Sequence, residues 1–420
     1  MNTAAHSLSR NLSRSLSALF ASLAALLAVA AQAATMPLAI HGETVYTAAG
    51  APIKDGLVLV HDGKISYVGP AAGQVYTADH RVLHAKVVTP GLIDAHATVG
   101  LSGLLNQPQD QDVLEKSAAV QPELRALDAY NAKDPLVAHV RSFGVTTVNT
   151  GHAPGALVSG QTMIVKTFGR TADEDVVNPA AMTNAALGKA GLNDATGKSP
   201  GTRSKEVAVL RAELIKAKEY VKKREAKDET KRPGRDLKIE TFLRALDGTQ
   251  PLLITAQLQQ DILSALRIAK EFDLKIVLDG CADAPLVLNE IKASGFPVVL
   301  HPTMARSNED TENLSVETAA KLQAAGILFA IQSGYEGYVP KTRVVLFEAA
   351  VAAANGLGFD HALESVTINA AKILGIADRT GSLEQGKDAD LALYDGDPFE
   401  YTSHCTGTVI NGQLFADGPH

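Results

Sequence analysis

One stretch decides the fold of this chain: Val88-Thr-Pro-Gly-Leu-Ile-Asp-Ala-His96-Ala-Thr98. Its apolar run ends in polar residues, which is typical of a buried strand whose last residues face a site. Similar apolar runs follow along the chain, separated by segments with helical periodicity, including 261–272 and 316–325. This alternation predicts βα units and a parallel sheet. The expected strands are 87–94, 146–150, 252–256, 276–279, 298–301 and 328–331, with 163–166 as a further strand or a hairpin.

The two ends of the chain differ from this middle part. The segment 57–68 holds two β-rich runs around Asp62-Gly63, which is typical of a tight hairpin turn. Residues 390–394 and 408–415 are also expected to be strands, the second with a turn at Asn411-Gly412. Both ends therefore predict an antiparallel sheet.

Length and charge limit the function classes. A chain of 420 residues predicts one large domain and a smaller one. Its net charge of -7 gives no indication of nucleic-acid binding. Arg10 and Arg14 precede an apolar run at 18–30, which ends in Ala31-Gln-Ala33. This order predicts a cleaved signal peptide over 1–33, a periplasmic or secreted protein, and no stable membrane anchor.

Four motifs carry a resemblance over nearly the whole mature chain. They are the hairpin at 55–69, Pro90-Gly-Leu-Ile-Asp94, the segment 367–375 and Gly381-Ser-Leu-Glu-Gln-Gly-Lys-Asp-Ala-Asp390. Together they resemble the amidohydrolase superfamily, and its imidazolonepropionase-like members in particular. The resemblance implies an α/β fold: a (β/α)8 TIM-like barrel over 90–381, with a composite β-sandwich formed by 34–89 and 382–420. In such barrels the chemistry lies at the C-terminal ends of the strands.

The resemblance also implies one or two divalent metal ions. The usual donors are two histidines on the first strand, one on each of two later strands, and a late aspartate. Here Thr98 replaces the second histidine, and no histidine lies between His152 and His301. No aspartate lies between Asp310 and Asp360. The sequence therefore predicts that the standard binuclear site is absent.

Other polar residues near the strand ends suggest a different, single-metal site with nitrogen and oxygen donors. We expect one divalent ion, zinc by preference, or none if the protein is inactive. Each histidine has a second interpretation, as a hydrogen-bonded residue that organises a loop. Lys166 is expected to be a surface lysine. The candidate residues are His96, His152 and His301 for metal, Asp279 and Glu336 for catalysis, and Gln161, Thr255 and Gln257 for substrate.

Two functions follow from the resemblance. The first is an exported hydrolase of carbon–nitrogen, non-peptide bonds in a small cyclic amide or related compound, with an atypical metal site. The second is a catalytically inactive member that binds a ligand or pairs with an active homologue. Either protein takes a small-molecule ligand. By analogy with the family we expect a homo-oligomer or a heteromer with a related amidohydrolase. The charge-dense segment 203–235 is expected to be a solvated helix and loop.

Overall fold

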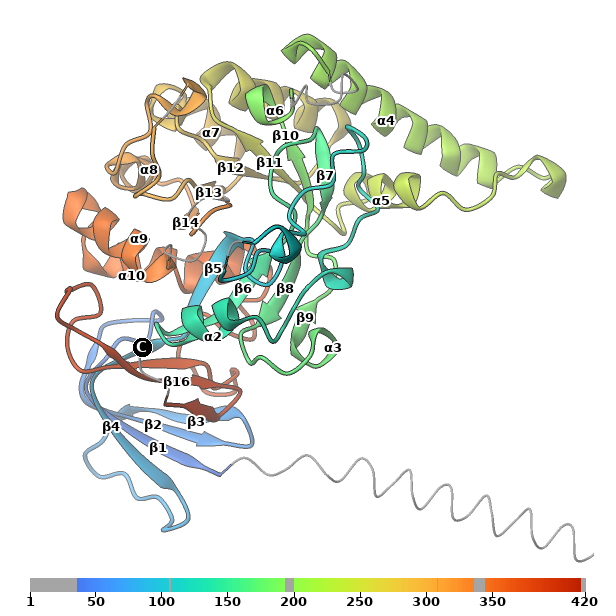
Figure 1. Ribbon diagram of the computed structural model, residues 1–420. Helices are drawn as coiled ribbons and strands as arrows, with labels where there is room; N and C mark the ends of the chain where they lie inside the picture. The colour runs from blue at the N-terminus through green and yellow to red at the C-terminus, as the bar shows by residue number, and fades with distance from the viewer. Residues whose placement is uncertain (1–35, 106, 193–199, 308, 336–343, 417–420) are drawn as a thin grey trace, which may run out of the picture.

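The computed structural model describes residues 36–105, 107–192, 200–307, 309–335 and 344–416 (Figure 1). One sheet combines strands from both ends of the chain, in the order β17-β16-β15-β4-β1-β2-β3. Its junction is the antiparallel pairing of β15 with β4. The strands are β1 (Leu38–Val45), β2 (Ile53–His61), β3 (Lys64–Pro70), β4 (Arg81–Pro90), β15 (Leu391–Tyr394), β16 (Cys405–Ile410) and β17 (Gln413–Phe415).

The middle of the chain contributes two further sheets. The larger one has the order β14-β13-β12-β11-β10-β7, and the smaller one β5-β6-β8-β9. Strands β10 to β14 are parallel, and so are β5 and β6. The strands are β5 (Leu92–Ala97), β6 (Val145–Thr150), β7 (Val158–Gln161), β8 (Met163–Lys166), β9 (Val176–Asn178), β10 (Thr183–Ala186), β11 (Leu252–Ala256), β12 (Ile276–Gly280), β13 (Val298–Leu300) and β14 (Phe329–Ile331).

Amphipathic helices cover these two sheets. In α6, for example, Ile262, Ala265 and Ala269 are buried at helical spacing, so one stripe faces the strands. Helices α6, α7 and α8 lie outside β11 to β13, whereas α4 runs away from the body (Figure 1). The helices are α2 (Pro135–Arg141), α3 (Ala172–Asp175), α4 (Arg203–Arg224), α5 (Leu237–Leu246), α6 (Gln259–Phe272), α7 (Leu288–Ser294), α8 (Thr318–Ala325), α9 (Val345–Ala352), α10 (Phe359–Ser365) and α11 (Ile368–Ile373).

The expected closed barrel is present only in part. Within the described residues, the strands form two sheets and not one closed ring. At one seam a single parallel bridge, Ala97 to Gly334, joins β5 to the chain after β14. At the other seam the chain passes directly from β7 to β8, and these two strands pair in different sheets. The expected sandwich likewise appears as one seven-stranded sheet.

The deciding stretch also differs from the expectation. A single strand over 87–94 was wrong, because β4 ends at Pro90 and β5 begins at Leu92. Gly91 makes this change of sheet possible, since a Cβ there would lie 2.3 Å from Thr146 Oγ1. Because of this break at Gly91, β4 pairs in the seven-stranded terminal sheet and β5 pairs in the four-stranded sheet of the middle part.

Among the described residues, no helix is both long enough and apolar enough to cross a membrane. The expected signal peptide lies outside the described residues.

Candidate active site

Two strand ends bring His96 and Asp279 together. His96 lies at the end of β5 and Asp279 near the end of β12, and both side chains are 0% exposed. His96 Nδ1 lies 3.0 Å from Asp279 Oδ1. Because a carboxylate only accepts hydrogen bonds, the Nδ1–H of His96 is the donor. The other ring nitrogen, Nε2, is buried and has no hydrogen-bond partner in the described part of the chain.

The Asp279 carboxylate has two more donors. Thr255 Oγ1 on β11 donates to Oδ2 at 2.6 Å. Gln332 Nε2, just after β14, donates to Oδ1 at 2.7 Å. Parallel pairing explains the first contact, because Thr255 stands opposite Asp279 in the register of β11 and β12. The buried Asp279 carboxylate on β12 therefore links residues of β5 and β11 and the residue just after β14.

Asp94 fixes the neighbouring seam. Its Oδ1 accepts the backbone N–H of Ser333 at 3.1 Å and that of His96 at 3.4 Å. Burial raises the pKa of Asp94 to about 6, since the surroundings disfavour its charged form. Asp94 therefore holds the end of β5 against the chain after β14.

A pocket of about 540 Å³ lies beside this cluster. Thr255, Gln257, His301 and Tyr335 line it, with Lys189 among its other residues. The ring of Tyr335 lies 5.3 Å from that of His96, centroid to centroid. Burial raises the pKa of Tyr335, so its hydroxyl stays protonated near neutral pH. The pocket therefore reaches the residue that contacts His96.

His301 is a neutral group at this pocket. Its Nδ1 donates to the Pro302 carbonyl at 3.0 Å, and Nε2 has no partner among the described residues. Burial lowers the pKa of His301 to about 4. The imidazole is therefore uncharged at neutral pH, with the Nε2 lone pair free.

The other candidate residues are placed differently. His152 packs against Gly160, where a Cβ would lie 2.2 Å from its ring carbon Cδ2, and burial lowers its pKa. Gln161 is buried within β7, donates to the Pro122 carbonyl at 2.7 Å and is not among the residues that line the pocket. Gln257 lines the pocket and accepts the Ala282 N–H. Glu336 lies outside the described residues.

The donor set does not fit the usual metal centre. Thr98 Oγ1 lies 3.0 Å from the Ser102 hydroxyl, and Thr255 and Asp279 bond to each other. The described residues contain no group of three His, Cys, Asp or Glu side chains that could hold a metal ion. Catalytic zinc sites use three protein ligands. In the described part of the chain, Nε2 of His96, Nε2 of His301 and both ring nitrogens of His152 lack a hydrogen-bond partner, but these three histidines do not come together as such a group.

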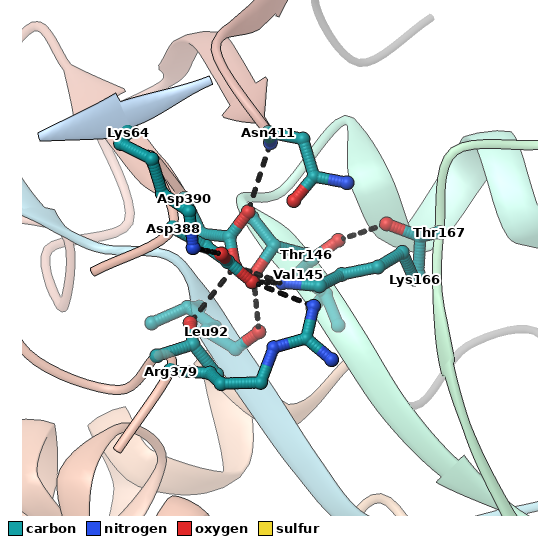
Figure 2. A network of polar contacts seen from close by, with 11 residues as sticks. Lys64, Leu92, Val145, Thr146, Lys166, Thr167, Arg379, Asp388, Asp390 and Asn411 are labelled. Atoms are coloured by element: carbon teal, nitrogen blue, oxygen red, sulfur yellow. Dashed lines mark hydrogen bonds and ion pairs between the residues drawn. The ribbon is translucent and has the colours of Figure 1, made fainter. Parts of the chain in front are cut away.

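Lys166 corrects another expectation, because it is buried and not a surface residue. It donates to Asp390 and lies 3.6 Å from Asp388 (Figure 2). Lys64 and Arg379 also pair with Asp388, at 2.5 and 3.0 Å. The apolar run at 163–166 gave no sign of this network, because its acidic partners come from a segment more than 200 residues later. This network ties β8 to the terminal sheet, and it leaves Lys166 no role in the pocket.

Gln332 belongs to the cluster around Asp279, and no motif in the sequence indicated it. It occupies the strand end where a late aspartate was expected, and the absence of that aspartate was the available signal. The side-chain amide of Gln332 donates a hydrogen bond to the Asp279 carboxylate. An aspartate at position 332 would instead repel this carboxylate. Thr255 and Gln332, which stand at strand ends where metal ligands were expected, both donate to Asp279.

The chain and its α/β fold are similar to known amidohydrolases. The model of the "Amidohydrolase family" matches residues 339–416. A solved amidohydrolase from Thermotoga maritima is 31% identical, covers 90% of this chain and 100% of its own, and has a TM-score of 0.85. The chain belongs to the amidohydrolase superfamily.

Two curated relatives and a further solved structure show which members of the superfamily the chain resembles. An imidazolonepropionase from Brucella anthropi is 27% identical over 82% of this chain and 87% of its own length. Amidohydrolase tasK of Hapsidospora irregularis is 24% identical over 87% of this chain, which spans only 40% of that longer protein. A zinc-bound adenosine deaminase from Xanthomonas campestris shares the fold at 17% identity and a TM-score of 0.53, over 91% of this chain and 93% of its own. Within the superfamily, the chain is imidazolonepropionase-like.

Proposed function

We propose that the protein is an exported hydrolase of carbon–nitrogen, non-peptide bonds, acting on a small cyclic amide or related compound. The reaction site is the pocket beside His96 and Asp279, on a (β/α)8-type barrel. One observation carries the proposal: Asp279 holds Nδ1 of His96, and Nε2 is left without a partner among the described residues. This is the arrangement of a histidine base oriented by a carboxylate.

The proposed chemistry needs no group beyond water. Nε2 of His96 takes a proton as water attacks the amide carbonyl carbon. The tetrahedral intermediate then collapses, the C–N bond breaks, and the proton passes from Nε2 to the leaving nitrogen. The protonated hydroxyl of Tyr335 is suited to donate a hydrogen bond to the carbonyl oxygen as negative charge develops there. Thr255 and Gln257 contact the substrate, and Glu336 remains a proposed catalytic carboxylate.

Hydrolysis of a panel of cyclic amides by chelator-treated protein tests this proposal. Loss of a positioned base lowers turnover by about 10²–10⁴-fold, so His96→Ala should reduce kcat by that range. Asp279→Asn should reduce kcat more than it raises KM, because it disturbs the base and not the pocket wall. The exposed lysine variant Lys133→Ala is the matched control. Full activity of His96→Ala would disprove the assignment.

A second function has its own support. His96 and Asp279 are fully buried, and the polar groups around them mostly bond to one another. This closed arrangement favours an inactive member that binds a ligand or pairs with an active homologue. Calorimetric binding of a cyclic amide with no turnover by wild-type protein would select this function.

Export, metal content and assembly complete the proposal. Cleavage after Ala33 would release the protein to the periplasm or the medium, and intact-mass measurement of the exported protein tests this. The expectation of one zinc ion at His96, His152 and His301 stays a prediction for elemental analysis. We also propose that the protein forms a homo-oligomer or a heteromer with a related amidohydrolase.

A further inference from the structure

A basic arm projects from the molecule. We define the arm as residues 216–235, the second half of α4 and the chain that returns to α5. Figure 1 shows α4 running outward from the body, with the end of the arm beyond the other elements. Helix α4 packs through one stripe, Leu210, Leu214, Ala217 and Tyr220, mainly against α5 and α6. Past Tyr220 no residue is buried until Ile239.

The part of the arm past Tyr220, residues 221–235, has no buried side chain and needs another source of stability. Fixing the backbone of one residue costs about 1–2 kcal/mol, and exposed ion pairs return about 0–1 kcal/mol each. The ion pairs of the arm are of this exposed kind, for example Lys231 with Asp228 and Arg232 with Glu229. Next to the arm and within it, Leu237 and Val221 are 61% and 38% exposed. These features fit a surface that a partner covers.

The charge of the arm defines the partner. The arm holds nine Lys or Arg and four Asp or Glu, a net charge of +5. The whole chain has 39 basic and 46 acidic residues, so the rest has 30 and 42, a net charge of -12. A shallow hollow of about 380 Å³ on the arm is lined by three lysines, Lys222, Lys223 and Lys231, together with Glu219 and Ala226. The rest of the chain thus has a net charge opposite to that of the arm, and another copy of the chain is present in any solution of this protein.

We propose that the arm docks onto the acidic body of a second copy of this chain. The arm would then be the contact surface of the homo-oligomer proposed above. This docking does not depend on the chemistry of the pocket. Opposite charges attract the copies over a range set by salt. The Debye length falls from about 30 Å at 0.01 M to about 3 Å at 1 M. The exposed aliphatic side chains Val221 and Leu237 then add short-range contact.

Sedimentation velocity of the mature full-length protein at about 0.01 M and about 1 M salt tests the proposal. We expect twice the chain mass at low salt and the chain mass at high salt. The variant Lys222→Glu/Lys223→Glu/Lys231→Glu should dissociate at least about tenfold more readily at low salt, because like charges then face each other. The control Lys133→Glu/Lys292→Glu/Lys321→Glu makes the same charge change at exposed sites elsewhere, and it should associate like wild type.

Three results would overturn the proposal: a wild-type monomer at low salt, equal association of the arm variant, or equal loss in the control. Binding of the arm to anionic phosphatidylglycerol vesicles, without self-association, would assign the arm to a lipid surface instead. Hydrolysis and ligand binding by the arm variant should match wild type. Failure of the pocket proposal is thus distinguishable from failure of this one.

Discussion

Replacing Lys166 by methionine removes the buried cation of the network in Figure 2. The Lys166 side chain is 3% exposed, and its partner Asp390 is 0% exposed. Among the described residues, Asp390 would keep two donors, the Thr380 hydroxyl at 2.8 Å and the Asn411 N–H at 3.0 Å. Removing one member of a buried ion pair costs about 3–5 kcal/mol. Because two donors remain, we expect a loss of about 3 kcal/mol from the free energy of unfolding.

Urea unfolding followed by circular dichroism measures this loss. Lys64→Met is the matched control, since Lys64 also pairs with Asp388 but its side chain is 51% exposed. An exposed pair contributes about 0–1 kcal/mol, so this variant should unfold close to wild type. Adding Asp390→Asn to Lys166→Met should recover part of the loss, because no unpaired charge then remains buried. Equal stability of Lys166→Met and Lys64→Met would refute the reasoning.

Three further outcomes are expected. Asp279→Ala removes the acceptor of His96 Nδ1 and Thr255 Oγ1 and leaves Gln332 Nε2 with the Val299 carbonyl at 3.2 Å. We expect it to reduce the free energy of unfolding by about 3 kcal/mol in urea titrations, and Asp279→Asn by less. Burial raises the pKa of Glu206 from 4.5 to about 8, so between these pH values the folded state retains a proton that the unfolded state releases. The free energy of unfolding should therefore fall as the pH rises from 4.5 to about 8, and Glu206→Gln should flatten this pH dependence. Elemental analysis of protein purified without chelators should find fewer than two zinc ions per chain, and two retained equivalents would contradict the donor assignment.

Local patterns predicted most of the strands. The apolar runs match β6, β11, β12, β13 and β14 within two residues at either end, because buried parallel strands are continuous in hydrophobicity. The hairpin turn is also as expected, with positive φ at Asp62 and Gly63. Strands β7 and β10 were missed, since Val158–Gln161 and Thr183–Ala186 are short and rich in polar or small residues.

The site was harder to predict, because its contacts join distant segments. Thr98 and the histidine-free interval between His152 and His301 predict that the usual donors are missing, and this stays a prediction. The sequence did not predict that Asp279 accepts hydrogen bonds from three distant side chains. These contacts depend on the register of β11 and β12 and on the position of Gln332. The prediction that Lys166 is exposed was wrong for the same reason. No local pattern shows that a lysine after an apolar run will meet two aspartates more than 200 residues later.

The sequence distance within that ion pair constrains how the protein is made. Lys166 and Asp390 are 224 residues apart, and a ribosome adds about 5–20 residues each second. During synthesis, β8 therefore exists for about 10–45 seconds before its counter-ion does. A chain that stops before residue 388 would have to bury a lone ammonium group or leave β8 undocked. The ion pair thus makes the packing of β8 depend on completion of the polypeptide, and shortened products should be preferred substrates for proteolysis.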